Sequence, residues 1–302
     1  MATDKWTRRD LFRRGAALGA VAIGGPVLLS ACSERATTGS GEGGTLQRIK
    51  DAKTVKIGIA GEVPYGFTEG GEVTGEAPEV AKAVFKAMGI PEVEAEQVEF
   101  GQLIPSLNAS RYDMVAAGMA ILPDRCKEAD FSVVDYVTPT AFMVPKGNPE
   151  GVANFEDVKA KGLAVAVLSG TIEQSVAEAT GISSDNIQPY DGQAELFQAL
   201  QDERAYCGAL TDISLRQLIK DNPDAPLEVT DGFVPVLDGK DQIQAGGFVF
   251  RKGEDDLLDA FNAELTKLHD SGEWLTIVAP FGFTEDNLPP EGVTTEQLCA
   301  GE

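Results

Sequence analysis

Two apolar segments with the same pattern decide how this chain folds. One is TAFMVPK at residues 140–146 and the other is GGFVFRK at residues 246–252; each reads as a strand that ends in a basic residue. Around them, predicted strands alternate with predicted helices, which is typical of a mostly parallel sheet with helices on its faces. A chain that builds two such lobes needs one extended segment to leave the first lobe and another to return. The sequence therefore predicts an α/β protein of two lobes joined by two crossover strands.

The remaining elements follow from apolar periodicity. Strands are predicted at residues 55–60, 93–100, 114–117, 163–168, 187–190 and 206–210. Helices are predicted at residues 79–88, 103–110, 172–180, 194–202, 213–220 and 255–271. The expected limits are 45–143 with 248–302 for lobe one and 144–247 for lobe two.

Residues 1–31 have the features of an export signal. Arg8 and Arg9 form a twin-arginine block, which marks the route that exports folded proteins. The uncharged stretch at 15–31 has only 17 residues, which makes it a poor membrane-spanning helix. The sequence LSAC follows the bacterial lipobox pattern, so Cys32 is the expected site of lipidation. The alternative is an ordinary signal peptide that happens to contain a cysteine.

Residues 32–44 are rich in Thr, Gly, Ser and Glu, and we expect them to form a flexible tether. The folded part is then expected to work outside the cell, on the outer face of the membrane. Its only link to the membrane would be the lipid anchor.

Charge and composition exclude several kinds of partner. The formal net charge is −23, and because residues 1–31 carry +3, the rest carries −26. So acidic a chain repels phosphate backbones, and we expect no nucleic-acid partner. Solubility is the simplest reason for the charge; a medium rich in salt or cations is the alternative. The cysteines and the single histidine, His269, fit no zinc pattern, so neither a metal nor another cofactor is expected.

Several short motifs, in this order and spacing, resemble the family 3 solute-binding proteins of ABC importers. They are GEAPEV at 75–80, Gly118 with Arg125 seven positions later, DFS at 130–132, SGT at 169–171 and SGEW at 271–274. Within that family the chain is most similar to the ectoine/hydroxyectoine-binding proteins. That similarity rests on PDRC at 123–126, KGNP at 146–149, FGF at 281–283 and LC at 298–299.

The resemblance implies a periplasmic-binding-protein-like fold of type II. It also implies a function: capture of a small zwitterionic solute by hinge closure, and delivery to the membrane subunits of an ABC importer. The protein is expected to be a monomer and not an enzyme. Three alternatives stay open, namely a binder of polar or cationic amino acids, a dehydratase-like enzyme on the same scaffold, and a sensor lipoprotein.

The resemblance also implies a carboxylate site. Arg125 offers a planar guanidinium fork that grips a carboxylate through two hydrogen bonds. Backbone N–H groups at Ser169 and Thr171, at the start of a predicted helix, suit the second carboxylate oxygen. The alternatives are a surface ion pair for Arg125 and an ordinary helix cap for Thr171.

The opposite end of the ligand is expected to be a cation. Glu62 matches the acid that meets the positive ring nitrogens in the ectoine binders, and Tyr65 and Phe100 would supply aromatic faces. A solvated loop acid and two core aromatics are the alternative interpretation.

Two positions depart from the ectoine pattern. Ala120 stands where the ectoine binders have an aromatic residue, so one wall of the cage is missing or comes from elsewhere. Asp212 stands where amino-acid binders commonly place the acid that holds an α-ammonium group; the alternative is that Asp212 caps the helix that follows it. Together they favour a bulkier or more positive ligand than ectoine.

Cys126 and Cys299 both have counterparts in the ectoine-type pattern. A disulfide between them would fasten the C-terminal tail to the loop that carries Arg125. Cys207 is expected to be a small buried hydrophobic residue of lobe two.

Overall fold

The computed structural model describes residues 44–237 and 239–301. The expected export signal, the lipidation site at Cys32 and the tether up to residue 43 lie outside the described residues. All described residues belong to one compact unit, Gly41–Glu302. Among them, no helix combines the length and the apolar character needed to cross a membrane.

The first lobe is built on a six-stranded mixed sheet with the order β4-β1-β5-β15-β6, in which β7 also pairs with β15. Its strands are β1 (Thr54–Ile59), β4 (Glu92–Gln97), β5 (Met114–Ala120), β6 (Asp130–Phe131), β7 (Tyr136–Thr138) and β15 (Gln244–Phe250). β1 runs parallel to β4 and to β5, whereas β15 runs antiparallel to β5.

Helices cover both faces of this sheet because successive strand residues point to opposite sides. In β5, Met114 and Ala116 pack into the cluster formed with α2, α9 and α10, whereas Val115 and Ala117 pack into the cluster formed with α3. The helices of this lobe are α1 (Thr45–Ala52), α2 (Glu76–Ala87), α3 (Leu103–Asn108), α4 (Pro123–Glu128), α9 (Asp255–Ser271), α10 (Glu273–Val278) and α11 (Thr295–Ala300). A short hairpin is made of β2 (Phe67–Glu69) and β3 (Glu72–Thr74).

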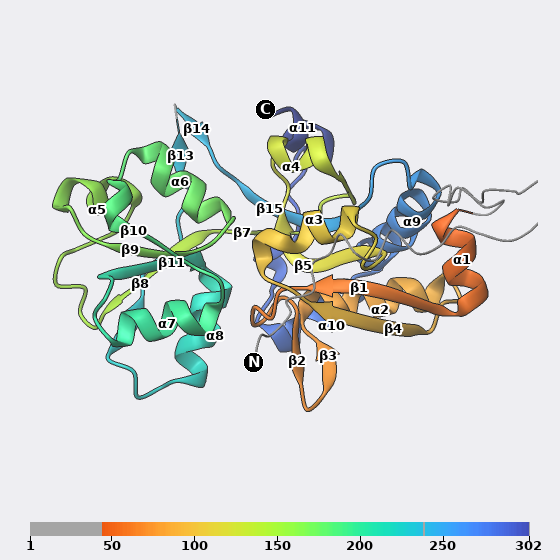
Figure 1. Ribbon diagram of the computed structural model, residues 1–302, viewed down its shortest axis with the longest axis horizontal. Coiled ribbons are helices and arrows are strands. Elements are labelled where there is room, and N and C mark those ends of the chain that lie inside the picture. Colours follow the sequence, from red (N-terminus) through yellow and green to blue (C-terminus); the bar gives the residue numbers. More distant parts are fainter. Residues whose placement is uncertain (1–43, 238, 302) are drawn as a thin grey trace, which may run out of the picture. The chain divides into compact units, whose positions relative to one another are not determined.

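The second lobe repeats the design with a five-stranded sheet in the order β10-β9-β11-β8-β12. Its strands are β8 (Thr140–Pro145), β9 (Val165–Leu168), β10 (Ile187–Tyr190), β11 (Cys207–Thr211) and β12 (Leu227–Val229). Its helices are α5 (Phe155–Lys161), α6 (Ile172–Thr180), α7 (Gln193–Gln201) and α8 (Asp212–Asp221). Figure 1 shows α5 and α6 on one face of the sheet and α7 and α8 on the other.

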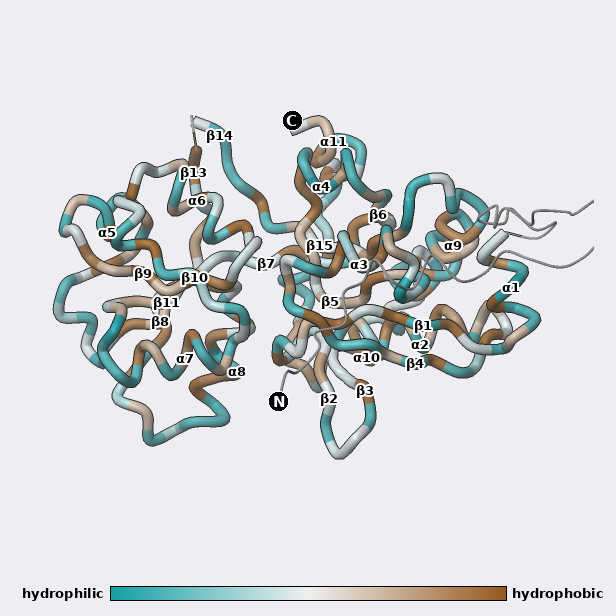
Figure 2. Tube along the Cα trace, viewed as in Figure 1, coloured by the Kyte–Doolittle hydropathy of each residue, from teal (hydrophilic) through white to brown (hydrophobic). Residues whose placement is uncertain are grey.

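The strand residues of the second sheet again alternate between two cores. Phe142 and Val144 pack with α5 and α6, whereas Ala141 and Met143 pack with α7 and α8. Hydrophobic residues accordingly concentrate on the inner strands, and hydrophilic ones on the outer turns (Figure 2). A small hairpin of β13 (Val236–Leu237) and β14 (Lys240–Asp241) precedes the return to the first sheet.

The prediction of two α/β lobes joined by two crossovers is confirmed. The chain changes sheet at Pro139, between β7 and β8, and changes back just before Gln244. The predicted lobe limits at 143/144 and 247/248 fall inside β8 and β15. We propose lobe one as 44–139 with 244–301 and lobe two as 140–237 with 239–243.

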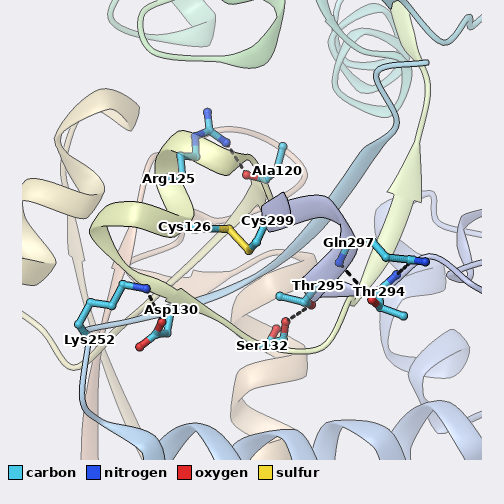
Figure 3. The surroundings of a disulfide bond; sticks show 10 residues. All are labelled: Ala120, Arg125, Cys126, Asp130, Ser132, Lys252, Thr294, Thr295, Gln297 and Cys299. Carbon is cyan, nitrogen blue, oxygen red and sulfur yellow. Dashed lines mark hydrogen bonds and ion pairs between the residues drawn. A yellow bond between two sulfur atoms is a disulfide. The ribbon is translucent and has the colours of Figure 1, made fainter. Parts of the chain in front are cut away.

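A disulfide joins Cys126 of α4 to Cys299 of α11, with a Cα–Cα distance of 5.6 Å (Figure 3). Beside it, the Thr295 hydroxyl donates to the Ser132 carbonyl at 2.6 Å. The C-terminal helix is thus fastened next to the helix that carries Arg125. Cys207 is a free, fully buried thiol in lobe two, and burial raises its pKa.

Two buried carboxyl groups are neighbours in lobe one. Glu76, in the first turn of α2, is fully buried, and its carboxyl oxygens accept no hydrogen bond from the described residues. Asp135 beside it accepts from Trp274 Nε1 at 2.8 Å and lies 3.1 Å from His269 Nε2. Burial, and then the Asp135 charge, raise the pKa of Glu76 well above its usual value. Glu76 therefore keeps its proton at neutral pH.

We expect the free energy of unfolding of the wild type to fall as pH rises, and the Glu76→Gln variant to show less of this fall. At pH values between the usual carboxyl pKa and the higher pKa in the folded state, Glu76 is protonated in the folded protein and ionised in the unfolded chain. The free energy of unfolding then falls by up to about 1.4 kcal/mol per pH unit. Glutamine has the same shape and does not titrate. Denaturant unfolding between about pH 5 and pH 8 measures this change in stability.

The matched control is Glu79→Gln, because Glu79 lies on the same helix, partly exposed and paired with Lys82. Its stability should follow the wild type across the range. Parallel wild-type and Glu76→Gln curves would contradict the assignment of a proton to Glu76.

Candidate functional site

A small cavity lies where residues of both lobes meet. Lobe one lines it with Glu62, Tyr65, Phe100, Gly118, Ala120, Arg125 and Gln244. Lobe two lines it with Thr171, Ile172, Glu173, Leu210 and Thr211. Its volume is about 30 Å³, which holds only one or two waters. A solute reaches this space only if the lobes move apart.

Larger hollows lie on the surface and differ in kind. One of about 370 Å³ is lined by residues of both lobes, among them Ile121, Ile172 and Lys240. One of about 340 Å³ lies in lobe two beside Phe155 and Phe233, and one of about 800 Å³ lies in lobe one beside α2 and α10. None of the described residues that line these three hollows is a buried charged group. The small cavity lined by Arg125 and Glu62 therefore carries the charged groups suited to binding a ligand.

Hydrogen bonds join the lobes around the cavity, and those of Glu62, Val63 and Arg125 form three sets. The Ser214 hydroxyl of lobe two donates to Glu62 Oε1 of lobe one at 2.6 Å. The Gln193 side-chain amide pairs with the backbone of Val63, accepting from its N–H at 3.1 Å and donating to its carbonyl at 2.8 Å. Arg125 Nη2 of lobe one donates to the Gly170 carbonyl of lobe two at 2.8 Å.

Arg125 supplies the positive charge of the cavity. It projects from α4, where Pro123 pre-sets the first turn. Its Nη1 donates to the Ala120 carbonyl at 2.7 Å, and its guanidinium carbon lies 5.3 Å from the centre of the Phe100 ring. Burial lowers the pKa of Arg125 to about 10, so it stays cationic at neutral pH.

Glu62 supplies a negative charge at the join between the lobes. It lies in a tight turn closed by hydrogen bonds between Gly61 N–H and the Gly66 carbonyl and between Gly66 N–H and the Glu62 carbonyl. Its side chain is 7% exposed. Burial raises the pKa of Glu62 to about 7; the Ser214 hydrogen bond opposes this shift, and the charge of Glu173 adds to it. Glu62 therefore titrates near neutral pH.

Tyr65 is both a wall of the cavity and a core residue. Its ring centre lies 5.4 Å from that of Tyr136 and 5.7 Å from that of Phe283. Gly118 makes room for this ring: it has a φ of +63°, and a Cβ there would lie 2.2 Å from Tyr65 Cδ1. Glycine is thus required at 118 both by its backbone angle and by contact.

The start of α6 differs in detail from the prediction. Thr171 is the N-cap residue and lines the cavity, but its hydroxyl donates to the Leu168 carbonyl at 2.9 Å and does not cap the helix. The N–H of Ser169 donates to Tyr190, and that of Gly170 to the Gln174 side chain. Ser169 does not line the cavity, and its hydroxyl lies 3.4 Å from Asp191 Oδ1.

Asp212 lies beside the cavity and does not line it. Its carboxylate accepts from Thr138 Oγ1 at 3.1 Å and from Arg216 Nε at 3.2 Å. The cap of α8 is Thr211, whose hydroxyl accepts from the Ser214 N–H, so Asp212 does not cap the helix either. Thr211, one position earlier, is the residue that reaches the wall.

Besides Thr211, two further polar wall residues were not predicted from the sequence. Gln244 begins the returning crossover strand, and its Nε2 donates to Glu173 Oε1 at 2.7 Å and to Thr140 Oγ1 at 2.6 Å. Glu173 is in the first turn of α6, two positions after Thr171. The sequence did contain signals for both residues. Gln244 is a polar residue at the edge of an apolar strand, and Glu173 is an acid in the turn that was expected to face the ligand.

Residues 55–296 match the model of a protein family described as bacterial extracellular solute-binding proteins, family 3. The chain belongs to this family. The match covers both lobes and both crossovers of the fold described above.

Similar proteins agree with this membership. The probable amino-acid ABC transporter periplasmic-binding protein y4tE of Sinorhizobium fredii (strain NBRC 101917 / NGR234) is 33% identical over 260 residues, 85% of this chain and 86% of that protein. The arginine-binding extracellular protein ArtP of Bacillus subtilis (strain 168) is 29% identical over 248 residues, 82% and 92% of the two chains. The crystal structure of EhuB in complex with hydroxyectoine matches with a TM-score of 0.77 and 31% identity, over 85% and 98% of the two chains.

The protein is therefore a solute-binding protein of an ABC transporter and works on the extracellular or periplasmic side. Its ligands are small polar solutes, and it is a binding protein, not an enzyme.

We expect Gly118→Ala to destabilise the protein by about 2–5 kcal/mol. The left-handed backbone costs a residue with a Cβ about 1–2 kcal/mol. The clash with the Tyr65 ring adds about 1–3 kcal/mol. Gly147→Ala is the matched control, because Gly147 has a φ of +82° and a Cβ added there would meet no atom within 4 Å. Denaturant unfolding compares the two, and equal losses would contradict the contact with Tyr65.

Proposed function

We propose that this protein captures a small zwitterionic solute by closing its two lobes over it. One observation carries the proposal: Arg125 and the buried acid Glu62 line the same cavity between the lobes. A ligand with a carboxylate at one end and a cation at the other would satisfy both charges, which are costly to bury without partners.

The carboxylate would bind at Arg125. Two of the five guanidinium N–H donors are used by the carbonyls of Ala120 and Gly170, which leaves three donors for a ligand. Thr171 lies on the facing wall, at the positive end of α6. A carboxylate between them would contact both lobes and so favour the closed state.

The cation would lie at Glu62, beside the ring of Phe100. The Phe100 ring offers a face to a delocalised cation, while Tyr65 closes the wall and, because burial raises its pKa, stays neutral. Ala120 leaves space where a third aromatic ring would otherwise stand. Ser214, which now donates to Glu62, would keep doing so when Glu62 is ionised.

Ectoine and hydroxyectoine are the first candidates, since EhuB, a similar protein of known structure, is in complex with hydroxyectoine. A polar or cationic amino acid is the second candidate. The small side chain at Ala120 and the relatives described as amino-acid and arginine binders support it. Asp212, which pairs with Arg216, lends no support to an α-ammonium site there.

We further propose that the chain is exported by its twin-arginine signal and anchored through a lipid on Cys32. Closure over the solute would then present both lobes to the membrane subunits of the importer. The strongly acidic folded part would stay in solution at the membrane surface, as a monomer, with no nucleic-acid partner.

We expect Arg125→Lys to weaken binding of the zwitterion by about ten- to hundredfold, because an ammonium keeps the charge but loses the planar fork. Calorimetry with ectoine, hydroxyectoine, betaines and amino acids identifies the ligand and measures the loss. Arg216→Lys is the control, since Arg216 is exposed and pairs with Asp212 outside the cavity. Failure of the wild type to bind any member of the panel would refute the proposed function.

We expect Cys32→Ala to move the protein from the membrane fraction to the soluble fraction of a bacterial host that exports it. Without the thiol no lipid can be attached, and the tether alone has no affinity for a bilayer. Fractionation and mass spectrometry of the mature N-terminus measure the effect, with Cys207→Ala as the unchanged control. A Cys32→Ala protein that stays on the membrane would rule out this anchor.

A further inference from the structure

A second buried acid, Glu173, lines the same cavity as Glu62. Glu173 is 3% exposed in the first turn of α6, and its Oε1 accepts the Gln244 hydrogen bond at 2.7 Å. Its charge raises the pKa of Glu62 and opposes the lowering of the Arg125 pKa, so it lies within electrostatic reach of both. Burial raises the pKa of Glu173 itself.

The charges of the cavity wall do not balance. Among the described residues that line it, Arg125 is the only base, whereas Glu62 and Glu173 are both acids. A ligand carboxylate would neutralise Arg125, which leaves two acids for the other end of the ligand. A single positive charge neutralises one of them. The second acid must then hold a proton or meet a second positive charge, because a buried unpaired carboxylate is costly.

No neighbouring group relieves this imbalance. Behind the wall in lobe one lie Tyr65, Tyr136 and Glu76, which burial keeps neutral by raising their pKa values. In lobe two, Asp212 is another acid, and Arg216 is already paired with it. The missing positive charge must come from the ligand or from a proton.

We propose that Glu173 sets the net charge of the preferred ligand: together with Glu62, it makes the site select a solute that has one carboxylate and a net positive charge. This inference rests on the proposed capture of a zwitterion and chooses the second of its two ligand classes. L-Arginine, with one carboxylate and two cationic groups, is the simplest probe of that class. Hydroxyectoine, a zwitterion without net charge, would bind only with a proton on one of the two acids.

Calorimetry of the purified chain at about pH 8 tests this with L-arginine and hydroxyectoine as probes. Glu173→Gln should weaken L-arginine binding by about ten- to hundredfold, the effect of losing one charged contact. The same variant should not weaken hydroxyectoine binding and should tighten it at this pH, because that ligand then needs no proton on either acid. The glutamine has the same size, and its carbonyl can still accept the Gln244 hydrogen bond.

Glu178→Gln is the matched control. Glu178 belongs to the same helix and is exposed, and among the described residues its carboxylate accepts a hydrogen bond only from the Gln174 side chain. It removes the same charge from α6 outside the cavity, and both affinities should stay at the wild-type values.

A second measurement needs no variant. In calorimetry of the wild type in two buffers of different ionisation enthalpy, L-arginine should release about one proton more than hydroxyectoine, since it leaves both acids ionised. Equal proton release by the two probes would overturn the inference.

The outcomes separate the two proposals. If the wild type binds hydroxyectoine but not L-arginine, the inference on Glu173 fails and zwitterion capture stands. If Glu173→Gln leaves the ratio of the two affinities unchanged, the inference fails in the same way. If neither probe binds, the inference fails, and zwitterion capture is refuted with it only if the ectoine, betaine and amino-acid panel fails to bind as well.

Discussion

The guanidinium of Arg125 is shared between the two lobes: one nitrogen donates to a lobe-one carbonyl, at Ala120, and the other to a lobe-two carbonyl, at Gly170. The groups around the cavity have to accommodate this partly buried positive charge. Two acids face the same space, and closure removes them from water, where their mutual repulsion would have been weak. The site is therefore defined less by its shape than by a charge balance that only a ligand can complete.

The positions of Arg125 and Glu62 depend on packing contacts made by other residues around the cavity. Gly118 lets the Tyr65 ring lie flat against β5, and that ring in turn shapes the turn that carries Glu62. On the other side, the disulfide at Cys126 is adjacent in sequence to Arg125 and fastens α4 to the C-terminal helix. In the proposed hinge closure, these supports on both sides would confine the movement to the two crossovers and so keep the geometry of each half-site.

Much of the fold could be predicted from the sequence because its signals are local. The helix predicted at 255–271 has those limits in the structure, where Gly272 ends it in the left-handed conformation. The helix predicted from 79 begins earlier, at Glu76, because Pro78 is tolerated within a first turn. The strand predicted to end at 100 stops at Gln97, and Phe100 opens a short 3₁₀ turn.

The site was less predictable because it depends on contacts between lobes. Most of the residues proposed from the sequence do line one cavity, yet Ser169 and Asp212 do not, and the reason is clearest at Asp212. The reason is the direction of the side chains at the start of α8. Thr211 lines the cavity, whereas Asp212, the next residue, faces away from it and pairs with Arg216. Glu173 was missed for the opposite reason, since only closure brings its turn of α6 against Gln244 and within reach of Glu62.

The Cys126–Cys299 bond has a topological consequence. It spans 173 positions, and both crossovers and the whole of lobe two lie between its two ends. Lobe two is thus carried on lobe one as a closed covalent ring. A protease that cuts a single peptide bond anywhere in that ring, including either crossover, leaves the molecule in one piece, which suits a protein that works outside the cell.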